Sequence, residues 1–296
     1  MDKGRVVGCP LEDFIVLRKL FRTASALDGQ AAKERYRDMR KYLTIIMAAG
    51  ALLALTVAGI ATAEKPEVVQ VGNLKLTFNG GFSPKVLPKK TMAPIALTAE
   101  GKIDTLDGTH PPALKEFLVE TDKNGTINTK GYPVCKSGQL QAQDTKNAEA
   151  VCGDTIVGKG TTKIDIAMEE QGVIPVKSPL LVLNGGVKGG VTTLFIHAYI
   201  TVPVPSAVVT TVKIKKINKG RYGLLSTATI PKIAGGSGSV RSFALTVNKK
   251  FNYKGKKVSV LTAKCPDGKL QAHGTAVFAD GTRASAEIIR TCTGKG

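Results

Sequence analysis

Tryptophan is absent from this chain of 296 residues, and aromatic residues make up only 5% of it. A core built around large rings is therefore excluded, and the apolar interior must come from Val, Ile, Leu and Thr. These side chains are β-branched or pack well on a pleated surface, so they favour strands. With 32 glycines and 14 prolines available for turns, the composition predicts an all-β fold of many short strands.

Acidic residues are missing between Gln171 and Pro266, a stretch that holds 15 Lys and Arg. The rest of the chain after residue 63 is balanced in charge, so this stretch supplies the whole positive excess of that part. Such asymmetry indicates an anionic partner, although lysines that keep sheet edges soluble would give the same pattern. Two basic clusters, the second interleaved with aromatic residues, are predicted to bind a polyanion; their residues are Lys213, Lys215, Lys216, Lys219, Arg221, Lys249, Lys250, Tyr253, Lys254, Lys256 and Lys257.

Histidine is scarce, and His110, His197 and His273 are far apart in the sequence. No G-x-S-x-G motif indicates a hydrolase nucleophile, and no C-x-x-C motif indicates a metal site. The run Gly153–Gly160 resembles a phosphate-binding loop, but its last glycine replaces the magnesium-binding hydroxyl and a strand pattern follows. We therefore predict no catalytic residue, no metal ligand and no nucleotide or other cofactor. A secreted hydrolase, the least favoured alternative, would need His110 or His197 in a cleft beside a carboxylate.

Only one long apolar run occurs, from Leu43 to Ala63. It follows three basic residues and ends in Ala61-Thr62-Ala63, which is the order of a secretory signal. We therefore predict a signal peptide over residues 42–63, transient membrane contact, and a protein that is secreted or kept in the cell envelope. The alternative is an uncleaved anchor that holds an extracytoplasmic domain at the membrane. Residues 1–41 form an N-terminal leader with two possible explanations. Either the protein truly starts at Met39, or these residues are a short cytoplasmic tail.

Four cysteines follow the apolar run: Cys135, Cys152, Cys265 and Cys292. An even number in an exported chain indicates disulfides rather than metal ligands. Four cysteines permit three connectivities, and short loops close most easily, so we favour Cys135–Cys152 and Cys265–Cys292. Each bond should stabilise the fold by about 3–4 kcal/mol by limiting the unfolded chain.

Alternating apolar and polar residues predict roughly a dozen strands at sandwich-like spacing. The expected fold is an antiparallel β-sandwich-like structure, either one large domain or two packed halves over residues 64–175 and 176–296. The second half is strongly basic, and the boundary would fall within Gly172–Pro179. One short helix is predicted at Thr145–Cys152, with Thr145 as its cap. Lys254-Gly255 is expected to form a turn inside the second basic cluster.

Three short motifs point to a known group of proteins: Asn128–Cys135, Leu180–Gly185 and Pro231–Gly236. Through them the chain, from Pro94 to Cys292, resembles an uncharacterised family of secreted actinobacterial β-rich proteins with no assigned activity. The resemblance implies export and a β-rich fold, and it implies a role for no particular residue.

These features together predict an exported, non-enzymatic binding module. Its basic β surface would engage anionic cell-envelope or extracellular polymers, or the headgroups of a lipid surface. The alternative is a purely structural or interaction protein of the envelope without a specific ligand.

Overall fold

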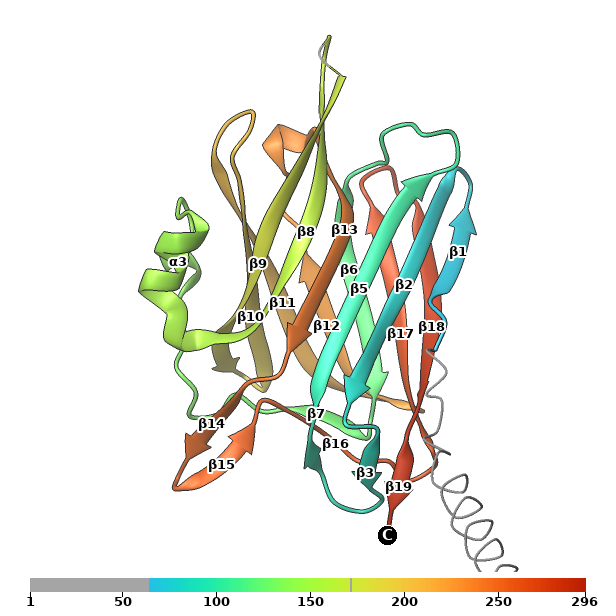
Figure 1. Cartoon of the computed structure of the whole chain (residues 1–296), viewed down its shortest axis with the longest axis vertical. Coiled ribbons are helices and arrows are strands. Elements are labelled where there is room, and N and C mark those ends of the chain that lie inside the picture. Colours follow the sequence, from blue (N-terminus) through green and yellow to red (C-terminus); the bar gives the residue numbers. More distant parts are fainter. Residues whose placement is uncertain (1–63, 171) are drawn as a thin grey trace, which may run out of the picture. The chain divides into compact units, whose positions relative to one another are not determined.

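Most of the chain after residue 66 folds into strands. The computed structural model describes residues 64–170 and 172–296, and twelve of its strands form one large antiparallel sheet (Figure 1). In chain order the twelve strands are β1 (Glu67–Val71), β2 (Leu74–Ser83), β5 (Ala96–Thr105), β6 (Leu114–Asp122), β8 (Ile156–Met168), β9 (Gly172–Lys188), β10 (Val191–Ile200), β11 (Ser206–Lys219), β12 (Tyr222–Thr229), β13 (Gly238–Val247), β17 (Lys269–Phe278) and β18 (Arg283–Thr291).

The order across the sheet is β1-β2-β5-β13-β8-β9-β10-β11-β12-β6-β17-β18. Every neighbouring pair is antiparallel. The sheet folds back on itself until β1 lies beside β18 (Figure 1), so it is nearly closed and barrel-like, with two facing layers. The predicted all-β, antiparallel fold is therefore confirmed.

Strands from the two predicted halves of the chain alternate within this sheet. β13, from residues 176–296, lies between β5 and β8, and β6, from residues 64–175, lies between β12 and β17. β9 begins at Gly172 and continues through the expected boundary without a break. Residues 64–296 accordingly form one compact unit.

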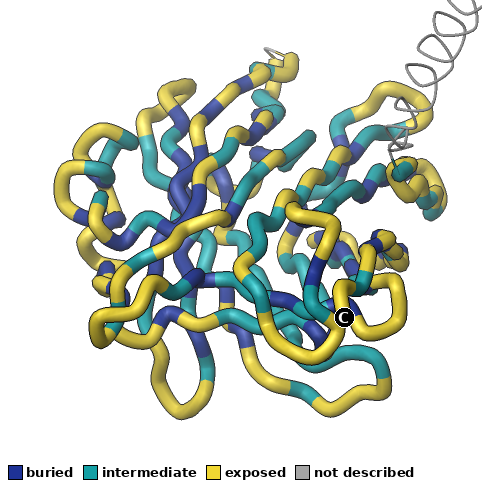
Figure 2. The backbone as a smooth tube through the Cα atoms, turned by 60° about the horizontal axis from the view of Figure 1, so that its bottom comes forward, coloured by how far each residue is buried: buried dark blue, intermediate teal, exposed yellow. Residues whose placement is uncertain are grey.

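Buried side chains gather at the two ends of the barrel-like sheet. At one end Leu74, Leu76 and Phe78 of β2 share a cluster with Phe278 of β17. At the other end Tyr132 and Val260 pack with inward residues of β9–β13. Figure 2 shows the same division along the chain, with buried stretches in the strands and exposed stretches in their connections.

Two disulfides mark one end of the sheet, which we call the disulfide end. The bonds are Cys135–Cys152 and Cys265–Cys292, so the predicted pairing is confirmed. The segments that connect the twelve strands or leave the sheet at this end are 84–95, 123–155, 189–190, 220–221, 248–268 and 292–296. They contain three small sheets, formed by β3 (Val86–Pro88) with β19 (Thr293–Lys295), by β4 (Ala93–Pro94) with β16 (Leu261–Ala263) and β7 (Gly125–Ile127), and by β14 (Lys250–Tyr253) with β15 (Lys256–Ser259).

The predicted helix is present as α3, over Thr145–Cys152. Its cap is Asp144 rather than Thr145, because the Asp144 carboxylate accepts a hydrogen bond of 2.7 Å from the backbone N–H of Asn147. Leu140 and Ala148 pack with Leu183, so this segment covers the outer face of β9 and β10. Three short 3₁₀ turns complete the structure: η1 (Ser137–Gln139), η2 (Gly153–Thr155) and η3 (Ala234–Gly236).

The predicted leader over residues 1–41 and the predicted signal peptide or anchor over residues 42–63 lie outside the described residues. Within the described part of the chain, no helix has the length and apolar character needed to cross a membrane.

Candidate functional site

Positive charge is concentrated at the disulfide end. The connecting segments of this end hold 15 Lys and Arg against 4 Asp and Glu. At the opposite end the connecting segments hold 1 Lys against 4 Asp and Glu; they are residues 72–73, 106–113, 169–171, 201–205, 230–237 and 279–282. The positive charge of this end therefore comes from several segments, within and outside the acid-free stretch Gln171–Pro266, and it gives the molecule one strongly positive end.

Part of the first predicted cluster is available to a partner. Lys213 and Lys215 lie on the outer face of β11, where they alternate with the buried residues Val212 and Ile214. Their side chains are exposed, and so is that of Lys216. These three lysines therefore present their ammonium groups to solvent close to the disulfide end.

The other two residues of the first cluster have carboxylate partners within the protein. Lys219 Nζ lies 2.9 Å from Glu120 Oε1, and this hydrogen bond lowers the pKa of the Glu120 carboxyl. Arg221 donates from Nε to Asp122 Oδ2 at 2.6 Å and also pairs with Asp267, whose pKa it lowers. The Lys219 side chain is still 69% exposed, whereas Arg221 is mostly covered, so Arg221 is the less accessible of the two to an external partner.

The second predicted cluster lies on the hairpin β14–β15. Its two-residue turn is Lys254-Gly255, and both residues have positive φ angles of 51° and 73°, as a type I′ turn requires. The five lysines of the cluster have exposed side chains. None of the five forms an ion pair with another described residue. The hairpin therefore offers the densest group of uncompensated positive charge in the part of the chain that the structure describes.

The aromatic residues of the hairpin hold it against the body of the protein. The ring centroid of Phe251 lies 4.9 Å from that of Tyr132, which belongs to the segment tethered by Cys135. Tyr253 is half-buried and its ring packs against Gly131, where a Cβ atom would have no room. This contact helps to fix the position of the hairpin lysines, and contact of the ring with a polyanion stays a prediction.

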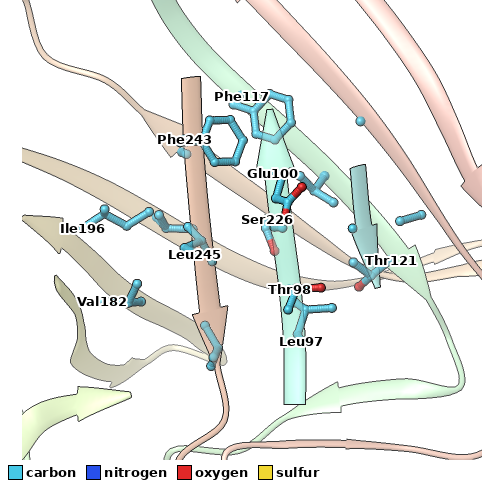
Figure 3. Close-up of a pocket in the computed structure, with 18 of the residues that line it drawn as sticks. Leu97, Thr98, Glu100, Phe117, Thr121, Val182, Ile196, Ser226, Phe243 and Leu245 are labelled. Atoms are coloured by element: carbon cyan, nitrogen blue, oxygen red, sulfur yellow. The ribbon is translucent and has the colours of Figure 1, made fainter. Parts of the chain in front are cut away.

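A second feature, which the sequence did not suggest, is an apolar cavity of about 400 Å³ inside the barrel-like sheet. Side chains from both layers line it, among them Val182, Ile196 and Leu245 (Figure 3). Phe117 and Phe243 also line it, with ring centroids 5.8 Å apart. At the disulfide end β7 and β16 contribute to the lining, so the segments that carry the basic residues also border the cavity.

The cavity exists because the inward side chains are too small for the number of strands. Barrels of about eight strands can be filled by their side chains, whereas larger ones leave a central space. Here many of the lining positions in the middle of the sheet carry small residues: Gly80, Ala99, Ala198, Ser226, Ala228, Ala272 and Gly274. Leu224 and Leu245 point inward and are nevertheless only half-buried, because they face the cavity rather than another side chain.

Among the described residues, only three charged side chains line the cavity, and two of these three are buried at the disulfide end. Arg290 is 5% exposed and donates hydrogen bonds to Asn79 Oδ1 and to the Gly80 carbonyl oxygen. Asp122 is 3% exposed and is paired with Arg221. The third, Glu100, is exposed. The cavity is thus apolar along most of its length and bordered by polar groups at one end.

The histidines lie apart from one another, and His273 Nδ1 lies 3.3 Å from Glu120 Oε2. His197 is fully buried, its Nε2 lies 2.9 Å from the Gln143 carbonyl oxygen, and burial lowers its pKa. His110 Nε2 lies 3.1 Å from the Asp165 carbonyl oxygen. Over residues 64–170 and 172–296, no group of three or more His, Cys, Asp or Glu is placed so that it could hold a metal ion.

No family model and no curated protein matches the chain. The distribution of charge and the interior cavity are therefore the two features from which a function can be inferred.

Proposed function

We propose that this protein is an exported, non-enzymatic binding module whose disulfide end engages anionic polymers of the cell envelope or the extracellular space. Two disulfides suit an oxidising compartment. The partner would be held mainly by its negative charge, because lysines attract anionic groups without a fixed geometry.

The observation that supports this proposal most directly is the charge difference between the two ends. A solubility coat would place lysine at both ends, whereas here the connections of the disulfide end hold 15 basic residues and those of the opposite end hold 1. The hairpin β14–β15 supports the same conclusion, since Phe251 and Tyr253 hold it in place while its lysines remain unpaired. A fixed group of cations binds a polyanion with less loss of conformational freedom than a mobile one.

The proposal is tested by retention on immobilised heparin over a series of salt concentrations. Neutralising the hairpin tip with Lys254→Gln, Lys256→Gln and Lys257→Gln should lower the eluting salt concentration. If each of the three lysines releases one counterion, the slope of log affinity against log salt falls by up to about 3.

A matched control removes three positive charges from another part of the sheet. Lys75, Lys163 and Lys177 are exposed on β2, β8 and β9, so Lys75→Gln, Lys163→Gln and Lys177→Gln give the same net charge. This triple variant should elute close to the parent protein. Equal shifts for both triple variants would show a response to net charge alone, as expected of an envelope protein without a specific ligand, and would refute the proposal.

A further inference from the structure

We propose that the interior cavity binds one aliphatic chain of a fatty acid or lipid, with the polar head of the ligand toward the disulfide end. This function goes beyond the engagement of an anionic polymer and does not depend on it. It follows from the shape of the cavity, the chemistry of its lining and the position of its charged residues.

The cavity is elongated. On β11 its lining runs from Val208 to Ile214, and at a rise of about 3.3 Å per residue this corresponds to a length of about 20 Å. A volume of about 400 Å³ along that length gives room for an extended aliphatic chain, whose carbon atoms would contact the lining at about 4 Å.

The lining selects against polar occupants. Water inside a protein needs two to four polar partners, and the middle of the cavity offers mainly carbon atoms from residues such as Leu224, Leu245 and Val182. A peptide would leave its backbone N–H and C=O groups unpaired, which is costly in an apolar site. An aliphatic chain has no such groups and gains from burial along its whole length.

The polar end of the cavity sets the orientation of the ligand. Arg290 has five N–H donors, and it gives hydrogen bonds to Gly80, Ile289 and Asn79. Glu64 lies nearby, with Oε2 at 3.5 Å from Arg290 Nε. Because Glu64 partly neutralises Arg290, the preference for an anionic head over a neutral one comes mainly from the lysines of the surrounding segments.

The test uses protein produced from the full-length chain, titrated with a fluorescent fatty acid and then with palmitate as a competitor. We expect saturable binding of one probe per protein and displacement by palmitate. Hexadecanol, which has the same chain and a neutral head, should compete at least several-fold more weakly. Mass spectrometry of an organic extract then distinguishes a free fatty acid from a diacyl lipid as the natural source of the chain.

Two adjacent residues of β12 provide a matched pair of variants. Ser226 lines the cavity, whereas Thr227 lies beside the exposed Lys213 on the outer face. Ser226→Leu should reduce affinity for the probe at least tenfold, because the added carbon atoms occupy space in the cavity that the chain would fill, while Thr227→Leu should stay within twofold of the parent. Ala272 of β17 also lines the cavity, so Ala272→Leu serves as a second filling variant whose binding should fall in the same way.

The proposal is overturned if the parent protein does not bind the probe, or if filling variants with a normal melting temperature bind it as tightly as Thr227→Leu. Competition by hexadecanol equal to that by palmitate would overturn the orientation of the head. Failure of this site is distinguishable from failure of polymer binding, because Ser226→Leu should keep its retention on heparin. In the same way, the Lys254, Lys256 and Lys257 variant should still bind one probe per protein, because its cavity lining is unchanged, although a less positive disulfide end lowers the affinity for the anionic head.

Discussion

Replacing Asp122 by alanine should destabilise the protein far more than replacing Asp267, although both carboxylates bond to the guanidinium of Arg221. Asp122 accepts hydrogen bonds from Arg221, from the backbone and side-chain N–H groups of Asn124, and from the backbone N–H of Gln271. Asp267 accepts only from Arg221 and the backbone nearby. The two variants therefore compare a buried and an exposed partner of one cation.

The expected magnitudes follow from burial. The side chain of Asp122 is 4% exposed, and breaking a buried ion pair costs about 3–5 kcal/mol. Because Arg221 keeps Asp267 as a partner, we expect the lower end of this range, about 3 kcal/mol. The side chain of Asp267 is 42% exposed, and a solvent-screened pair of this kind contributes about 0–1 kcal/mol.

Thermal denaturation with the disulfides intact measures the difference. For a domain of this size a change of 1 kcal/mol shifts Tm by about 2–4 °C, so Asp122→Ala should lower Tm by about 6–12 °C. Asp267→Ala should lower it by less than about 4 °C. A loss for Asp267→Ala as large as that for Asp122→Ala would refute the reasoning, because burial would then not decide the strength of these pairs.

Two further predictions concern stability. Burial lowers the pKa of His197, so the unfolded chain binds the proton more readily and the unfolding free energy falls as the pH drops below 6.5. In His197→Leu the unfolding free energy, measured by urea titration, should depend less on pH below 6.5. The same pH dependence in His197→Leu and in the parent would contradict a role of His197 in this loss of stability. Removing both cysteines of Cys265–Cys292 should lower the unfolding free energy by about 3.6 kcal/mol, and removing both of Cys135–Cys152 by about 3.1 kcal/mol, because the bonds close loops of 27 and 17 residues. Denaturant titration measures both, and a loss below about 1 kcal/mol for either pair would contradict the loop-closure argument.

Local features were predictable from the sequence because neighbouring residues determine them. The Ala-rich spacing of Thr145–Cys152 predicts the helix, and only its cap is displaced by one residue, to Asp144. Lys254-Gly255 forms the expected turn. The two disulfides join cysteines that are close in sequence, where closing a loop costs the least entropy.

Contacts between segments that are far apart in the chain could not be predicted from the sequence. The sequence places Lys219 and Arg221 in a basic cluster and does not show their carboxylate partners. These partners, Glu120 and Asp122, lie 99 residues away along the chain and come close only because β12 pairs with β6. The pairing of β13 with β5 is similarly remote. Alternation of apolar and polar residues identifies a strand and its buried face, but it does not identify the neighbouring strand.

The cavity depends on strand number and side-chain size together. Small residues at alternate positions, such as Ala272 and Gly274 on β17 or Ser226 and Ala228 on β12, were visible in the sequence. In a small barrel or a tight sandwich the same residues would simply allow two layers to approach closely. Only when twelve strands form one nearly closed sheet do these positions leave an empty interior.

The basic surface and the cavity meet at the disulfide end, and this arrangement limits what a ligand can be. β7 and β16 border the cavity and belong to the segments 123–155 and 248–268, which hold 10 of the 15 basic residues of that end. A polymer bound there would touch the lysines and leave the interior unused. A free hydrocarbon would fill the interior and leave the lysines unused. An amphiphile with an anionic head and one aliphatic chain uses both, because its charge stays among cations while its chain leaves water.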